Sequence, residues 1–81
     1  MTVRVLFHSY FRDLTGCAEL TRDLPSGTRL GQLLQQLQDE FPKLKSMDRS
    51  TLLAIGLEYQ DRNYELQDGD EVSMFPPVQG G

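Results

Sequence analysis

The chain has 81 residues, of which 38% are hydrophobic and none is tryptophan, and its formal net charge is −4. This length allows one domain with a modest core and leaves little room for an enclosed active site. The basic residues are scattered rather than gathered in a stripe, so nucleic-acid binding is not expected.

Cys17 is the only cysteine, so an internal disulfide is excluded and nothing indicates an oxidising compartment. The first residues, "MTVRVLFHSY", do not have the pattern of a signal peptide, and no apolar run approaches the length of a membrane span. We therefore expect a cytoplasmic protein that binds no membrane.

Two strands are predicted in the first third of the chain. Residues 3–7 alternate with period two and are apolar on both sides, which is typical of a strand inside a sheet. Gly16 is expected to end a short turn or helical segment. Residues 18–24 predict an outer, half-exposed strand with Leu20 and Leu24 facing inward. The short connection between the two strands favours an antiparallel hairpin.

One clear helix follows. Its apolar side chains recur at helical spacing and form a single stripe, which consists of Leu30, Leu33, Leu34, Leu37 and Phe41. Thr28 is the expected N-cap, because its hydroxyl can accept a hydrogen bond from a free N–H of the first turn. Pro42 disfavours the helical conformation at Phe41 and should end the helix there. A single stripe implies that the helix covers one face of a sheet.

The second half of the chain predicts further strands. Residues 43–50 are expected to be a polar connection, and residues 51–59 form an apolar run more typical of a strand than of a helix. A turn is expected at residues 60–63, followed by a brief strand or loop. The sequence Asp68-Gly69-Asp70 predicts another turn. Residues 71–75 predict the last strand, which Pro76 ends because proline cannot donate to a ladder.

Acidic residues gather between Glu58 and Glu71, with Arg62 as the single basic residue among them. A solvated face is the favoured interpretation, and a surface that steers a basic partner is the alternative. The acidic side chains around Gly69 lack the spacing of a calcium-binding loop, so turn formation explains them more simply. Because metal sites need several ligands, neither His8 nor these carboxylates predict one.

The last residues, "FPPVQGG", are expected to form a carrier arm. Pro76 and Pro77 fix two φ angles and hold the exit extended. The tail, residues 78–81, can then extend at most ~14 Å beyond the domain of residues 1–77. Gly80 and Gly81 carry no side chain and can enter a narrow channel. A carboxylate must be activated before it can be an acyl donor, so a partner holding ATP is implied. An ordinary frayed terminus is the alternative.

The order strand–strand–helix–strand–strand with a terminal Gly-Gly resembles the ubiquitin-like β-grasp proteins. Within that group the chain is similar to the sulfur carriers of the MoaD/ThiS family. The stretches that carry the likeness are "VRVLFHSYFRDLTG" and, more specifically, "LQDGDEVSMFPPVQGG". The resemblance implies an α+β fold in which one main helix lies across a mixed sheet of four or five strands. The family often has Asn where this chain has Gly56; both residues tolerate a positive φ.

The resemblance also implies the chemistry. The Gly81 carboxylate would be adenylated by an enzyme of the ubiquitin-activating type and converted to a thiocarboxylate. Its sulfur would pass to cyclic pyranopterin monophosphate inside the large subunit of molybdopterin synthase, in a heterotetramer. The carrier would bind no cofactor or metal, since the partner uses the ATP. Partner contacts are expected at an apolar sheet face and along the tail, and the candidates are Leu57, Tyr59, Phe75, Pro76 and Val78.

Several alternatives remain at this point. A sulfur carrier for thiamine synthesis or tRNA thiolation would have a similar tail. A ubiquitin-like interaction module would keep its function without Gly80 and Gly81, and a protein modifier would join Gly81 to lysines of its targets. Core packing would equally explain Phe75, Leu57 and Tyr59. Cys17 is expected to be an incidental or buried thiol.

Overall fold

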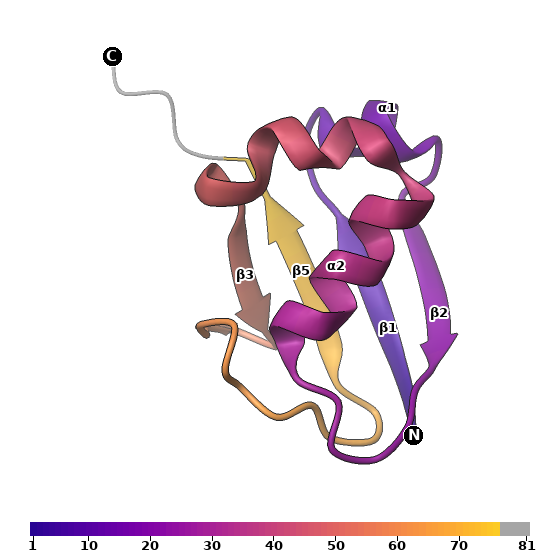
Figure 1. The fold of residues 1–81 in the computed structure, drawn as a ribbon, viewed down its shortest axis with the longest axis vertical. Coiled ribbons are helices and arrows are strands. Elements are labelled where there is room, and N and C mark those ends of the chain that lie inside the picture. The colour runs from indigo at the N-terminus through magenta and orange to yellow at the C-terminus, as the bar shows by residue number, and fades with distance from the viewer. Residues whose placement is uncertain (77–81) are drawn as a thin grey trace.

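The structure is a computed structural model that describes residues 1–76, apart from the side chains of residues 47 and 48. It contains five strands, two α-helices and one 3-10 helix. In chain order these elements are β1 (Thr2–Phe7), α1 (Phe11–Thr15), β2 (Glu19–Asp23), α2 (Leu30–Glu40), η1 (Pro42–Ser50), β3 (Leu52–Ile55), β4 (Glu58–Tyr59) and β5 (Glu71–Phe75). Figure 1 shows α2 lying diagonally across one face of the sheet.

The sheet has the strand order β2-β1-β5-β3-β4. β1 pairs antiparallel with β2 and parallel with β5, whereas β3 pairs antiparallel with both β5 and β4. The first and last strands of the described chain are therefore neighbours at the centre of the sheet. The predicted β-grasp architecture, a mixed sheet with one main helix across it, is confirmed, and so is the antiparallel pairing of the first two strands.

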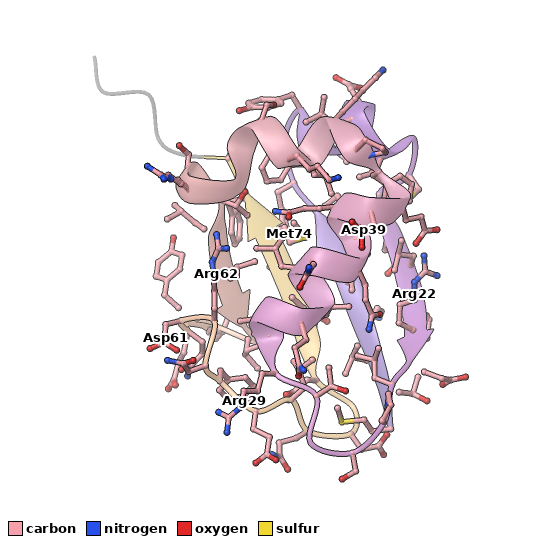
Figure 2. The ribbon with its side chains drawn as sticks, viewed as in Figure 1. Arg22, Arg29, Asp39, Asp61, Arg62 and Met74 are labelled. Atoms are coloured by element: carbon pink, nitrogen blue, oxygen red, sulfur yellow. The ribbon has the colours of Figure 1, made fainter. Side chains whose placement is uncertain are left out.

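The core lies between α2 and the sheet. The helical stripe predicted from the sequence is buried at Leu30, Leu33, Leu34 and Leu37, and Phe41 is partly buried at the helix end. Facing it are alternate residues of the strands, namely Val3, Val5, Phe7, Leu53, Val72 and Met74. Figure 2 shows Met74 behind α2. Because side chains alternate along a strand, the residues between them point to the opposite face of the sheet.

The N-terminus of α2 differs from the prediction. Arg29, not Thr28, is the N-cap, and the Oε1 atom of Gln32 accepts the N–H of Arg29 at 2.8 Å. The Thr28 hydroxyl instead donates to the carbonyl oxygen of Pro25 at 2.7 Å. The expectation that Thr28 caps the helix is therefore wrong.

A distant loop explains this difference. The N–H groups of Leu30 and Gly31 donate to the carbonyl oxygens of Tyr64 and Arg62, at 2.8 and 2.9 Å. These N–H groups belong to the first helical turn, which has no partners for them within the helix. Backbone carbonyls from the loop between β4 and β5 thus fill the role that the sequence assigned to a side chain.

The segment expected to be a polar connection is also different. Residues Pro42–Ser50 form the 3-10 helix η1, which packs against α1 and α2. Leu44 is buried in the core, and its N–H donates to the Phe41 carbonyl at 2.9 Å. A single buried leucine gives no periodic pattern, so the sequence offered no basis for predicting this helix.

The apolar run of residues 51–59 is confirmed as strand, but it is divided. Gly56, with φ 60°, turns the chain between β3 and the two-residue strand β4. Residues 64–67 form a loop with one isolated bridge, between Arg29 and Glu65. Within residues 1–76, no helix is both long and apolar enough to cross a membrane.

Candidate functional site

The strand that precedes the C-terminal tail, β5, lies at the centre of the sheet. β5 ends at Phe75, as predicted, and the half-buried Pro76 follows it directly. Val78, Gly80 and Gly81, which the sequence predicts as partner-binding and carrier residues, lie outside the described residues. The base of the arm is thus held by two neighbouring strands, β1 and β3.

The sheet face opposite α2 is called the open face here, because no described helix covers it. At the end near Pro76 it carries a group of apolar and aromatic side chains from four strands or their ends. This group, the exit patch, consists of Leu6, His8, Leu52, Tyr59 and Phe75. Strand register brings them together, since Leu52 pairs with Phe75 and Tyr59 pairs with Ala54. Tyr59 is 70% exposed and Leu52 36%.

Phe75 is the centre of the exit patch. The His8 ring stacks on the Phe75 ring with centroids 4.2 Å apart and an interplanar angle of 12°. Tyr59 approaches the same ring edge-on, with centroids 6.4 Å apart. The patch therefore presents aromatic rings directly beside Pro76, in the way that protein interfaces use aromatic anchors.

His8 is held firmly at the end of β1. Its backbone N–H donates to the backbone carbonyl of Met74 at 3.1 Å, and its backbone carbonyl accepts the backbone N–H of Phe11 at 3.2 Å. Ser9 follows with φ 58°, a left-handed conformation that turns the chain sharply into α1. The Nε2 atom of His8 is buried and has no hydrogen-bond partner among the described residues.

The other end of the open face is charged. Arg4 pairs with Glu71 and, at 3.6 Å, with Glu19. These side chains are exposed, so the pairs stabilise the fold only weakly. The open face is consequently polar at the end where β5 begins and apolar at the end where the tail begins.

The acidic residues between Glu58 and Glu71 are largely occupied by local structure. Asp68 accepts the N–H of Thr2 at 2.8 Å, and Asp70 accepts the Tyr64 hydroxyl at 3.0 Å and the Gln67 N–H at 2.8 Å. Desolvation by burial raises the pKa of Tyr64, and the hydrogen bond to Asp70 raises it further. These contacts agree with the interpretation that the carboxylates around Gly69 form a turn.

The structure brings together only some of the candidate partner-binding residues. Phe75, Pro76 and Tyr59 lie at the exit patch, whereas Leu57, although fully exposed, lies in the turn at the far end of β3. His8, Leu6 and Leu52 belong to the patch but were not predicted for it. The alternation of β1 placed Leu6 and His8 on one face, yet the sequence did not show which strand would lie beside them.

The described residues contain no group of three or more metal-ligating side chains. Cys17 is half-buried, with its Sγ atom 3.8 Å from the Thr15 hydroxyl.

A comparison with protein families matches residues 5–81 to the ThiS family. The chain belongs to the ThiS family. Among relatives in the ThiS family, the molybdopterin synthase sulfur carrier subunit of Chlamydomonas reinhardtii is 36% identical over 84 residues, and the match covers the whole of both chains.

Solved structures support the ThiS-family fold. A Pyrococcus furiosus protein assigned as subunit 1 of a molybdopterin converting factor matches with a TM-score of 0.87 and 31% identity, covering 96% of this chain and 99% of that one. Subunit 1 of the molybdopterin-converting factor of Helicobacter pylori, solved in a complex with subunit 2, matches with a TM-score of 0.71 and 27% identity over all of both chains.

Proposed function

We propose that this chain is the sulfur carrier subunit of a molybdopterin synthase. The observation that carries the proposal is the full-length likeness to sulfur carrier subunits, which extends to the end of the chain at Gly81. The geometry supports it, because β5 leads from the centre of a rigid sheet straight into the tail. An arm of this kind delivers its terminal atoms to another protein's active site while the domain stays outside.

The reaction takes place at the carboxylate of Gly81. ATP supplies an adenylyl group, pyrophosphate leaves, and the carboxylate becomes an acyl-adenylate. Sulfur at the oxidation level of sulfide then attacks the carbonyl carbon and AMP leaves, so that a C–S bond replaces the C–O bond to AMP and the thiocarboxylate forms. The thiocarboxylate is a better nucleophile than a carboxylate, so its sulfur can bond to a carbon of cyclic pyranopterin monophosphate. Water then cleaves the bond between the Gly81 carbonyl carbon and that sulfur, which returns the carboxylate. Two carriers serve each dithiolene, because two sulfur atoms are added.

The partners are the large subunit of the synthase and an adenylating enzyme of the ubiquitin-activating type. Support for a large subunit comes from the Helicobacter pylori relative, which is a complex of subunits 1 and 2. The exit patch is the surface that we assign to docking, since it adjoins the tail and exposes aromatic rings. Docking there would point residues 78–81 into the partner. We expect a heterotetramer with one carrier at each end, located in the cytoplasm, where ATP and reducing conditions favour this chemistry.

Mass spectrometry of the C-terminal tryptic peptide, Asn63 to Gly81, tests the proposal. The full chain is incubated with its host's adenylating enzyme, ATP and a sulfur donor, beside a known carrier as positive control. Sulfur replacing oxygen at Gly81 is the expected result. Because this change is nominally isobaric with oxidation of Met74, fragmentation must locate it. An unmodified Gly81 beside a working control would contradict the carrier function.

A second assay addresses the acceptor. The thiocarboxylated chain is mixed with the large subunit and cyclic pyranopterin monophosphate, and dithiolene formation is followed. A chain lacking Gly80 and Gly81 is the matched control, since it should keep the exit patch and lose the sulfur. Thiocarboxylate that forms but is never consumed here would indicate a carrier for thiamine synthesis or tRNA thiolation instead.

A further inference from the structure

One group in the exit patch has a property that apolar docking does not explain. His8 is the only histidine of the chain, and its ring stacks on Phe75 within a patch that is otherwise apolar or aromatic. Its Nε2 atom is buried without a hydrogen-bond partner among the described residues, although the rest of the side chain is partly exposed. Buried polar atoms are almost always paired, so an unpaired one needs a physical account.

The Nε2 atom of His8 faces no hydrogen-bond acceptor among the described residues. A neutral ring can leave Nε2 as a bare acceptor and place its N–H on Nδ1. Protonation would put an N–H on Nε2, where no described residue offers an acceptor.

No described residue forms a hydrogen bond with the Nε2 atom of His8, although charged residues border the exit patch. Arg49, Asp61 and Arg62 line a hollow together with Leu52 and Tyr59 of the patch. The strands on the open face present Arg4, Glu19, Glu71 and Tyr59, and the segments next to His8 present Tyr10, Arg12, Asp13 and Cys17. Glu71 lies opposite Arg4, four residues before His8 along the strand and hence about 13 Å away. Glu19 lies opposite Leu6, only two residues before His8, and its carboxylate is 3.6 Å from the Nε atom of Arg4. The Nε atom of Arg12 donates to the Ser9 carbonyl.

We propose that His8 makes docking of the exit patch proton-dependent, so that the large subunit binds the carrier well only while the imidazole is neutral. The inference rests on the proposed function, because it takes the large subunit as the molecule that covers the patch. Docking removes the remaining exposed part of the ring from water. A charged ring would then be buried against apolar and aromatic groups, which opposes association. Affinity therefore rises with pH across the range in which histidine side chains lose their charge.

The test compares the intact chain with a His8→Phe variant. Phenylalanine keeps a ring that can stack on Phe75 and removes the titrating group. Affinity for the large subunit is measured by calorimetry near pH 7.5, 6.5 and 5.5. The unsubstituted chain should bind about tenfold more weakly near pH 5.5 than near pH 7.5, after correction for any pH dependence that both proteins share. His8→Phe should not show this change in affinity. A His8→Gln variant, which also cannot titrate, gives the same comparison if His8→Phe folds poorly.

A second experiment follows the imidazole of His8 directly. With one histidine in the chain, isotope labelling of the carrier alone gives a single imidazole signal in both free and bound states. Docking should shift its midpoint of titration to lower pH. Identical pH profiles for the unsubstituted chain and both variants would overturn the inference while leaving the proposed function intact. Absence of binding at every pH would overturn the docking itself, and the inference with it.

Discussion

Gly31 of α2 lies directly against the backbone of Arg62. Its N–H donates to the Arg62 carbonyl oxygen at 2.9 Å. A β-carbon at position 31 would come within 3.0 Å of the Arg62 Cβ atom and 3.2 Å of that carbonyl oxygen. The contact joins the first turn of the main helix to the loop that leads into β5, so it links the core to the strand that carries the tail.

We expect Gly31→Ala to destabilise the fold by about 1–2 kcal/mol, because the added methyl group forces the Arg62 backbone away. The higher helix propensity of alanine opposes this loss by at most about 1 kcal/mol. Urea unfolding measures the difference. Gln35→Ala, at an exposed position of the same helix, is the control and should be close to neutral. A Gly31→Ala protein as stable as this control would show that the loop yields without cost.

Tyr64 should make the stability of the fold depend on alkaline pH. Burial and the bond to Asp70 raise its pKa in the folded state, so folding favours the neutral phenol. This contribution is complete below the ordinary tyrosine value of about 10 and is lost as pH rises through the higher folded value. Tyr64→Phe should remove that part of the alkaline loss and cost about 0.5–1.5 kcal/mol at neutral pH. Parallel stability curves for the two proteins up to the alkaline limit would contradict the expectation.

Tyr59 and Leu57 offer a matched pair for testing the exit patch. Both are exposed large side chains only two residues apart, but only Tyr59 contacts Phe75. Tyr59→Ala should weaken binding of the large subunit by roughly 10- to 100-fold, the range of an interface hot spot. Leu57→Ala should change it less than about threefold. Surface plasmon resonance measures both. If the two variants lose affinity equally, the docking surface extends along β3 and includes Leu57 as well as the exit patch.

Substitutions of Gly56 test whether this position needs only a residue that tolerates a positive φ. Its φ is 60°, and no atom outside its immediate chain neighbours lies within 4 Å of where a β-carbon would be. Gly56→Asn should therefore cost less than about 0.5 kcal/mol, since asparagine tolerates this conformation. Gly56→Val should cost about 1–2 kcal/mol, because a branched side chain is strained there. Thermal unfolding separates the two variants, and equal losses would indicate a contact beyond backbone conformation.

Local patterns in the sequence predict most of the elements. The alternation at Val3, Val5 and Phe7 and the stripe from Leu30 to Leu37 each describe one element whose buried side is visible in its own residues. The N-cap of α2 and the helix η1 were not predictable in this way. Both depend on tertiary partners, namely the carbonyls of Arg62 and Tyr64 and the pocket that receives Leu44.

For the same reason, only part of the candidate site could be predicted from the sequence. Phe75 was predicted because it lies at the base of the tail, and Tyr59 as a candidate on an apolar sheet face. His8 was not associated with them, because it is far from Phe75 in the sequence and meets it only through the parallel pairing of β1 with β5. Parallel neighbours give no local signature, since a long crossover connects them.

The pairing of β1 with β5 also affects how the protein is made. Arg4 and Glu71 are paired although 67 positions separate them. A chain emerging from the ribosome can therefore pair β1 with β2 early, but β1 lacks its other neighbour, β5, until nearly all of the domain has been synthesised. Contacts between such distant residues slow folding, and an incomplete chain has a gap in the middle of its sheet. Truncation before Glu71 would thus remove Val72 and Met74 from the core as well as the tail, so the strand that carries the arm is also needed to complete the core.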